Sequence, residues 1–234
     1  MIQENIKLVE ENIKKACEKV GRDVNEVTLI AVSKTKPYTA IEEALPTGVK
    51  DYGENKVQEL CDKYEILPKD IKWHMIGHLQ TNKVKYMAAF VSLIHGVESL
   101  KLLETIDKEG KKHDRVIPCL LQFYIASEET KFGLDMEEAK ALLESADYKN
   151  MKNVKIVGVM GMATNTDDEM QVRREFHHLK EIFDELKATY FAENPEFKEL
   201  SMGMSGDYRI AVEEGSTMVR VGSSIFGARN YANI

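Results

Sequence analysis

The sequence is poor in cysteine, carries no excess of positive charge and lacks long apolar runs. Its three cysteines, Cys17, Cys61 and Cys119, are widely spaced and form neither a CxxC pair nor a cluster of metal ligands, which is typical of reduced cysteines in a cytoplasmic protein. The formal net charge of -7 argues against a nucleic-acid partner, because such a partner requires a basic surface. No apolar run approaches the ~20 residues that a membrane span needs, so we expect no membrane partner.

The 234-residue chain also lacks a linker rich in proline, glycine or serine, and it has no low-complexity segment. Residues 1–21 alternate charged side chains with an apolar stripe. This pattern predicts an amphipathic helix and is unlike a signal peptide. We therefore expect one intracellular domain over residues 1–234.

Eight apolar, β-branched runs recur along the chain, separated by stretches with helical periodicity. They cover residues 27–33, 49–53, 71–77, 91–97, 116–126, 154–163, 199–204 and 217–227. Strands that alternate with helices predict a parallel sheet. Eight such units favour a single (β/α)8 barrel of the TIM type with an extra N-terminal helix, although about 250 residues is more usual. A doubly wound open sheet, the main alternative, usually has a glycine-rich turn after its first strand, and the segment SKTKP has none.

Two lysines, Lys34 and Lys36, follow the first predicted strand. Because strand side chains alternate, Ile30, Val32 and Lys34 share a face. Lys34 therefore points either into the top of the barrel or toward the helices, whereas Lys36, beside Pro37, can reach solvent. A desolvated amine at a barrel mouth can attack a carbonyl carbon to form a Schiff base. Taken alone, however, the segment favours an ordinary solvated lysine at a strand end.

The last predicted strand contains Arg220 between apolar neighbours, and Gly222, Ser223 and Ser224 follow it. Ser205 lies in the preceding loop. Barrel enzymes frequently bind phosphate with the loops after strands seven and eight, using backbone N–H groups at the start of a short helix. Glycine and serine also make ordinary turns, but two adjacent turns rich in donors predict a phosphate site.

Arg220 has two interpretations. It either pairs with a carboxylate such as Glu213 or Glu214, or lies in the barrel mouth as a fixed cation. A guanidinium beside a pyridine nitrogen would keep that nitrogen unprotonated, because two cations repel. The ring would then be a weak electron sink.

Several segments, taken in order, resemble one family. They are AVSKTKP, YGENKVQE, WHMIGHLQTNK, GVMGMAT, LSMGMSGD and STMVRVGSSIFGAR. Together they are similar to the pyridoxal phosphate homeostasis proteins (the YggS/PROSC type), which are related to the N-terminal barrel of alanine racemase. The resemblance covers essentially the whole chain and implies a single barrel that binds pyridoxal 5′-phosphate (PLP).

The resemblance also implies roles for individual residues. Lys34 matches the Schiff-base lysine, Asn55 the polar residue near the ring and its hydroxyl, and Arg220 the partner of the ring nitrogen. The residues that match the phosphate cradle are Ser205, Gly222 and Ser223. No catalytic residue and no metal ligand are expected.

The family implies a protein that carries or buffers PLP and supports vitamin B6 homeostasis, with PLP-dependent apo-enzymes as candidate recipients. Alanine racemase takes a tyrosine base from a second domain across a dimer interface, and only a few residues follow the last predicted strand here. We therefore expect a monomer without robust catalytic activity. Two alternatives stay open: a PLP-dependent amino-acid racemase of minimal barrel type, and an aldolase-like barrel in which Lys34 reacts with substrate and no cofactor is used.

Other polar residues give weaker signals. His74 and His78 are four positions apart but flank Gly77 at a strand end and lack an HExxH context, so we predict no metal site. His78 also stands where the family commonly has proline. His177 and His178 belong to a charged amphipathic helix and are expected at the surface. Lys131, in the loop after the fifth strand, is expected to be solvated.

Overall fold

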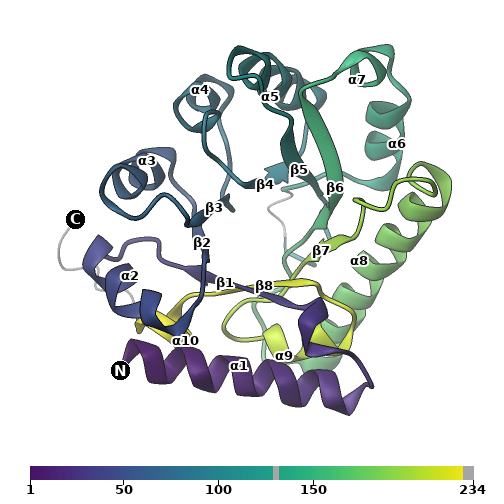
Figure 1. The fold of residues 1–234 in the computed structure, drawn as a ribbon. Coiled ribbons are helices and arrows are strands. Elements are labelled where there is room, and N and C mark those ends of the chain that lie inside the picture. Colours follow the sequence, from purple (N-terminus) through teal and green to yellow (C-terminus); the bar gives the residue numbers. More distant parts are fainter. Residues whose placement is uncertain (129–131, 229–234) are drawn as a thin grey trace.

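The computed structural model describes residues 1–128 and 132–228, in which eight parallel strands close into a barrel in chain order, with β1 paired to both β2 and β8 (Figure 1). The strands are β1 (Thr28–Val32), β2 (Asp51–Glu54), β3 (Lys72–Met75), β4 (Leu93–Val97), β5 (Ile117–Gln122), β6 (Val154–Met160), β7 (Glu199–Ser201) and β8 (Met218–Val221). Seven of them lie inside one of the eight predicted runs, and β2 extends one residue beyond the run 49–53, to Glu54. The closure of β1 onto β8, with Ile30 opposite Arg220, confirms the TIM-type barrel and excludes the open sheet.

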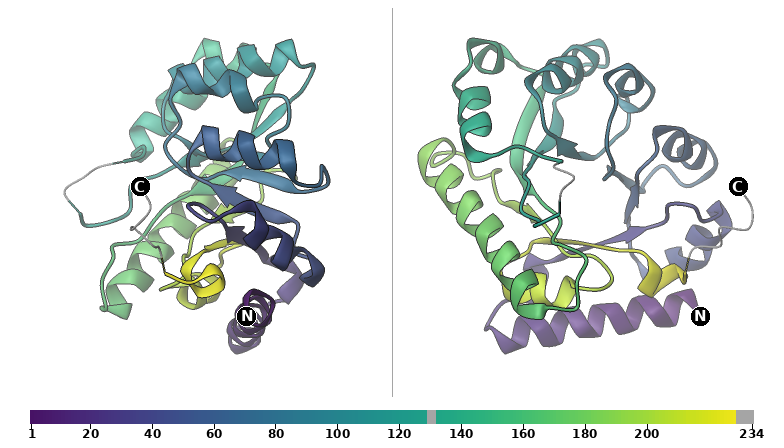
Figure 2. Two further views of the ribbon diagram at one scale, coloured as in Figure 1. Left: turned by 90° about the vertical axis from the view of Figure 1, so that its left-hand side faces the viewer. Right: turned by 180° about the vertical axis from the view of Figure 1, so that it is seen from behind.

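Helices surround the strands on the outside of the barrel (Figure 2). They are α1 (Ile2–Lys19), α2 (Tyr38–Ala44), α3 (Val57–Ile66), α4 (Val84–Met87), α5 (Leu100–Lys112), α6 (Met136–Glu144), α7 (Ala146–Asn150), α8 (Glu169–Thr189), α9 (Tyr208–Glu213) and α10 (Ser223–Phe226). The described part of the chain also forms three short 3₁₀ turns: η1 (Val24–Glu26), η2 (Leu45–Thr47) and η3 (Thr81–Lys83). Within the two described segments, none of these helices is both long and apolar enough to cross a membrane.

The predicted N-terminal helix is α1, which lies along α9 and α10 at the edge of the barrel (Figures 1 and 2). Its apolar stripe is buried at Ile6, Val9, Ile13, Ala16 and Cys17. Polar contacts fix the helix in place: the side-chain amide of Asn5 donates to the carbonyl of Ile225 at 2.8 Å. The extra helix thus covers the outside of the final βα unit, next to the turn predicted to bind phosphate.

Local capping explains where several helices begin. The Ser99 hydroxyl accepts the Leu102 N–H at the start of α5. Asp135 and Glu138 exchange hydrogen bonds in a capping box at α6. Asp168 accepts two backbone N–H groups at α8. These side chains satisfy N–H groups that the first helical turn leaves without partners.

Apolar residues form two layers. The larger layer fills the space between strands and helices, and includes Trp73 and Met75 of β3. The smaller layer lies inside the barrel and consists of Ile30, Leu93, Leu120, Val157, Met160 and Met218. Because β3 side chains alternate, His74 faces the barrel interior. The interior is therefore partly polar, although branched apolar residues usually fill it.

Candidate functional site

A cavity of about 470 Å³ opens where the barrel strands end. All the residues predicted to bind the cofactor line it: Lys34, Asn55, Ser205, Arg220, Gly222 and Ser223. Arg220 belongs to β8, and the other five follow β1, β2, β7 or β8 within four residues. The closed barrel therefore brings them together. Val32, on the same face of β1 as the interior residue Ile30, also lines the cavity. Lys34 comes two residues after β1 and lines the same cavity, so of the two directions predicted for it the structure has the one toward the top of the barrel.

A buried cluster supports the turn that presents Lys34. The Ser33 hydroxyl donates to Glu54 Oε1 at 2.6 Å. Lys63 Nζ donates to the carbonyl oxygen of Ser33 at 2.7 Å and to Glu54 Oε1 at 2.6 Å. Glu54 is fully buried and Lys63 nearly so. Because the cluster anchors the residue before Lys34 on both its hydroxyl and its carbonyl, it fixes the direction in which the lysine leaves the strand.

The next residue, Thr35, has a backbone φ of 63°, which is unusual for a residue with a branched side chain. Its N–H donates to Glu59 Oε1 at 2.7 Å, and Lys63 donates to that same oxygen at 2.8 Å. The same ion-pair cluster therefore holds the backbone on both sides of Lys34.

The stability of this cluster should depend on pH. Burial raises the pKa of Glu54 to about 7, and Lys63 and Ser33 oppose that rise. Because the folded pKa lies above the ordinary value, this group's contribution to stability is full below about pH 4.5 and is lost as pH rises through about 7. The free energy of unfolding of the wild type, relative to Glu54→Gln, should fall by up to about 3 kcal/mol across this window.

Urea denaturation of both proteins between pH 4.5 and pH 8 measures this difference. Glu11→Gln, which alters an exposed carboxylate of α1 outside the cluster, serves as the control. The prediction would be wrong if the free energy of unfolding of the wild type, relative to that of Glu54→Gln, stayed constant or rose with pH.

Asn55 packs closely against Gly77. A Cβ added at Gly77 would lie 2.5 Å from Asn55 Cβ and 2.6 Å from the Asn55 carbonyl oxygen, which is too close for any real contact. Both residues line the cavity. A side chain at position 77 would therefore displace the backbone that positions Asn55.

Gly77→Ala should lower the free energy of unfolding by about 1–3 kcal/mol, because overpacking forces the backbone to shift. Gly206→Ala is the matched control, since a Cβ there meets nothing within 4 Å, and its effect should stay within about 0.5 kcal/mol. Chemical denaturation compares the two variants. If Gly77→Ala and Gly206→Ala were equally stable, the backbone around Asn55 would be able to accommodate a side chain at position 77 without loss of stability.

Arg220 is buried, with 3% of its surface exposed. Its Nη1 donates to Ser201 Oγ at 2.5 Å and its Nη2 donates to the Gly161 carbonyl at 3.1 Å. Burial lowers the pKa of Arg220 to about 10, while nearby Asp207 opposes the shift. The guanidinium therefore remains a cation at neutral pH. It lies at the cavity, which agrees with the interpretation of Arg220 as a fixed cation in the barrel mouth.

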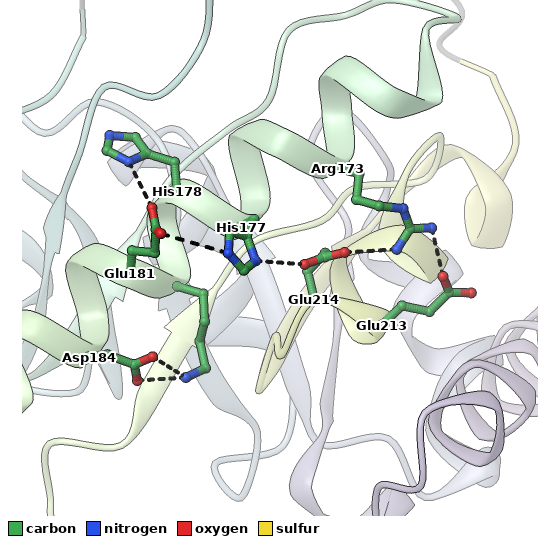
Figure 3. Close-up of polar contacts among 8 residues, drawn as sticks. Arg173, His177, His178, Glu181, Asp184, Glu213 and Glu214 are labelled. Atoms are coloured by element: carbon green, nitrogen blue, oxygen red, sulfur yellow. Dashed lines mark hydrogen bonds and ion pairs between the residues drawn. The ribbon is translucent and has the colours of Figure 1, made fainter.

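The other interpretation, a pair between Arg220 and Glu213 or Glu214, is wrong. Those carboxylates bind Arg173 of α8 at 2.7 and 2.8 Å (Figure 3), and Glu213 also accepts from Lys19 of α1. The two glutamates lie at the end of α9, on the outside of the barrel. Glu213 and Glu214 are close to Arg220 in the sequence, but the fold directs their side chains to the outside of the barrel, where they bind Arg173 instead.

His177 and His178 are at the surface, as predicted. Figure 3 shows both beside Glu181, and His177 also contacts Glu214 at 3.2 Å. The pair joins the outer ion-pair network and does not reach the cavity.

The predicted phosphate turn lies at one end of the cavity. Ser205 Oγ accepts the N–H groups of Gly222 and Ser224 at 3.1 and 3.2 Å. A Cβ at Gly222 would come within 3.3 Å of the Val32 carbonyl oxygen, so glycine permits the close packing of this turn on β1. Hydroxyl and N–H groups converge here, and such donors suit an anion.

The two histidines considered as metal ligands are separated by the fold. His74 faces the interior and contacts His95 and Asp51. His78 lies at the cavity mouth, where its Nδ1 is 3.4 Å from Glu98 Oε1. In residues 1–128 and 132–228, no group of three or more histidine, cysteine, aspartate or glutamate side chains could hold a metal ion.

Sequence reasoning missed other cavity residues. Gln122 ends β5 and lines the cavity, and its polar side chain at the end of an apolar run was the available signal. Apolar side chains also contribute, from Ile76, Phe132, Met162 and Met204. Apolar residues of these types usually fill a core, which was the default interpretation of Met162 and Met204 near their strand ends. Lys131 lies outside the described residues.

Comparison with known proteins gives the family. Residues 5–230 match the family described as alanine racemase, N-terminal domain. The pyridoxal phosphate homeostasis protein of Aquifex aeolicus is 42% identical over 229 residues, which cover 97% of this chain and 98% of that protein.

Solved structures agree with this match. The structure of PipY from Synechococcus elongatus with PLP bound has a TM-score of 0.80 and 31% identity, covering 97% of this chain and all of that one (100%). The crystal structure of a protein from Bifidobacterium adolescentis has a TM-score of 0.88 and 32% identity, covering 96% and 94%. This chain therefore belongs to the pyridoxal phosphate homeostasis protein family, within the alanine racemase N-terminal domain family.

Proposed function

We propose that this chain binds PLP in the cavity at the carboxyl ends of the strands, as a Schiff base on Lys34, and carries or buffers PLP for vitamin B6 homeostasis. The observation that carries the proposal is that one cavity contains an amine, a buried guanidinium and an anion-binding turn. The name of the Aquifex relative and the PLP bound to PipY support it.

The lining residues fit the chemical groups of PLP. Lys34 supplies a primary amine, which can add to the aldehyde carbon to give an imine with loss of water. The Ser205 hydroxyl, which keeps its own hydrogen to donate, and the N–H of Ser223 suit the phosphate, while Gly222 lets this turn pack closely on β1. Asn55, which has both a donor and an acceptor, suits the ring hydroxyl. Apolar residues such as Ile76 and Met204 suit the faces of the ring.

Arg220 argues for storage in preference to catalysis. When bound, PLP supplies an aldehyde that captures amines and a pyridine ring that withdraws electrons. A guanidinium has only donors, so Arg220 at the ring nitrogen favours the unprotonated, less electron-withdrawing ring. We accordingly propose that the protein has no robust catalytic turnover.

The direct test is to add PLP to the purified protein, reduce with borohydride and map the modified peptide by mass spectrometry. The proposal expects a yellow protein, bleaching on reduction, and a pyridoxyl group on the peptide that contains Lys34. A protein that stays colourless and takes up no PLP would refute both PLP-based functions and favour the aldolase-like barrel.

A racemase remains the second candidate because the His78–Glu98 pair places two titratable groups at the cavity mouth. Incubation of the PLP-loaded protein with L-alanine, followed by chiral chromatography, distinguishes the two functions. Storage predicts no sustained formation of D-alanine. Turnover at ordinary enzyme rates that is abolished in His78→Ala would establish the racemase.

The carrier role requires transfer to a recipient. We propose PLP-dependent apo-enzymes as recipients, and a monomeric, cytoplasmic protein folded as a single domain over residues 1–234. Mixing PLP-loaded protein with an apo-enzyme while a trap removes free PLP tests the transfer. Activation of the apo-enzyme despite the trap supports direct delivery, whereas no activation limits the role to buffering.

A further inference from the structure

A chain of buried polar groups crosses the barrel interior below the cavity. His74 Nε2 lies 2.8 Å from Asp51 Oδ1, and His74 Nδ1 lies 2.9 Å from His95 Nε2. His95 Nδ1 lies 2.8 Å from Ser201 Oγ, which accepts from Arg220 Nη1. The chain thus links residues of β2, β3, β4, β7 and β8.

The two ends of the chain have different environments. His95 and Ser201 are fully buried, and His74 and Arg220 are 3% exposed. The Asp51 side chain is 20% exposed and lines a cavity of about 450 Å³ at the amino ends of the strands. The chain therefore runs from that end of the barrel to the guanidinium at the proposed PLP site.

The chemistry of the end groups gives the hydrogen bonds one direction. The guanidinium of Arg220 can only donate, and the carboxylate of Asp51 can only accept. With neutral imidazoles, His74 must donate from Nε2 to Asp51 and accept at Nδ1 from His95 Nε2–H. His95 then accepts at Nδ1 from the Ser201 hydroxyl, whose oxygen accepts from Arg220. Every donor in the chain points away from the PLP site.

Burial supports the neutral form of the central imidazole. The pKa of His95 lies well below its ordinary value, mainly through burial and further through His74 and Arg220. A second cation beside the buried guanidinium is therefore disfavoured. Because each polar group has a partner, the chain also avoids the cost of unsatisfied donors and acceptors inside the barrel.

We propose that Asp51, His74, His95 and Ser201 are positioning residues that act through Arg220, fixing the place and donor direction of its guanidinium at the PLP ring. This inference rests on the proposed function for its role in PLP binding. Ser201 holds Nη1 while the Gly161 carbonyl holds Nη2. Both terminal nitrogens of the guanidinium are thus held by the protein itself. The aligned dipoles of the chain have their negative ends toward Arg220 and therefore stabilise its buried positive charge.

The histidine tautomers test the chain without PLP. We expect side-chain ¹⁵N NMR of the protein at neutral pH to show His95 neutral and protonated at Nε2, with signals assigned by His74→Gln and His95→Gln. A His95 protonated at Nδ1, or an imidazolium, would overturn the proposal. This readout stands even if the wild type takes up no PLP, which would refute the proposed function alone.

A matched pair of serine variants tests the coupling to the PLP site. Ser216 is as buried as Ser201, but its hydroxyl bonds backbone carbonyls of Met202 and Met218 and does not join the chain. Ser201→Ala should weaken PLP binding roughly tenfold, the equivalent of one lost buried hydrogen bond, and shift the absorption band of bound PLP. Ser216→Ala should leave both unchanged.

Ser201→Thr, which keeps the hydroxyl, should restore binding and the absorption band. Circular dichroism checks that each variant folds. If Ser201→Ala fails to fold, Asp51→Ala at the exposed end replaces it, and the His95 signals should then show a mixture of tautomers. Equal effects of Ser201→Ala and Ser216→Ala on PLP binding, or an unaltered His95 tautomer in Asp51→Ala, would reduce the chain to a structural role and overturn the proposal.

Discussion

Lys34→Ala should abolish the covalent attachment of PLP completely. The cavity contains two lysines among its described lining residues, Lys34 and Lys36, and the proposal assigns the imine to the first. Lys34 lines the cavity just after β1, and the cluster of Ser33, Glu54 and Lys63 fixes the backbone before it. Lys34→Ala therefore removes the amine that this cluster positions in the cavity, and with it the proposed nucleophile.

Borohydride reduction followed by intact mass measurement gives the result directly. Lys36→Ala is the matched control, because Lys36 lines the same cavity while its Nζ donates to the Ala228 carbonyl at 2.9 Å. That variant should keep the adduct on Lys34. Retention of the adduct in Lys34→Ala, or its loss in Lys36→Ala alone, would transfer the Schiff base to the other lysine.

Arg220→Met should have the second large effect, on both stability and PLP binding. The substitution keeps a long side chain but removes the donors to Ser201 Oγ and the Gly161 carbonyl. Two buried acceptors would lose their partner, so the free energy of unfolding should fall by about 2–4 kcal/mol. PLP affinity should fall with it, because the proposed contact to the ring nitrogen is lost.

Arg173→Met provides the comparison for Arg220→Met. Arg173 also binds two acceptors, Glu213 and Glu214, but on the outer surface (Figure 3). The Arg173 side chain is 31% exposed and its two carboxylates only 10% and 15%, so its loss should also lower the free energy of unfolding. Because Arg173 does not line the cavity, this variant should bind PLP normally. Denaturant titration and PLP titration of both variants measure the difference. Equal losses of PLP affinity in the two variants would show that Arg220 has no special role at the site.

Arg220→Glu should change the absorption spectrum of bound PLP, because a carboxylate at that position favours a protonated ring nitrogen. An unaltered spectrum and affinity would argue against contact between residue 220 and the ring. Storage of PLP depends on this contact in the proposed function, since a neutral ring nitrogen limits reaction of the bound cofactor with cellular amines.

The local pattern of the sequence was sufficient to predict the barrel. Eight β-branched runs alternating with helical periodicity require parallel pairing, and the missing glycine after β1 disfavoured the open sheet. The period of two along a strand placed Lys34 on the same face as Ile30. Because parallel strands all end at one rim, the polar residues after them had to converge, and Ser205, Gly222 and Ser223 do so.

The partners of buried polar groups were decided by the tertiary structure alone. Glu54 and Lys63 face one another because β2 and α3 pack together outside the barrel. His74, His95 and Ser201 come from strands far apart in sequence, and their distances depend on how the barrel closes. For the same reason Arg220 binds Ser201 instead of the nearby Glu213. Periodicity fixes the face on which a side chain lies, whereas the closure and register of the barrel decide which side chain it meets.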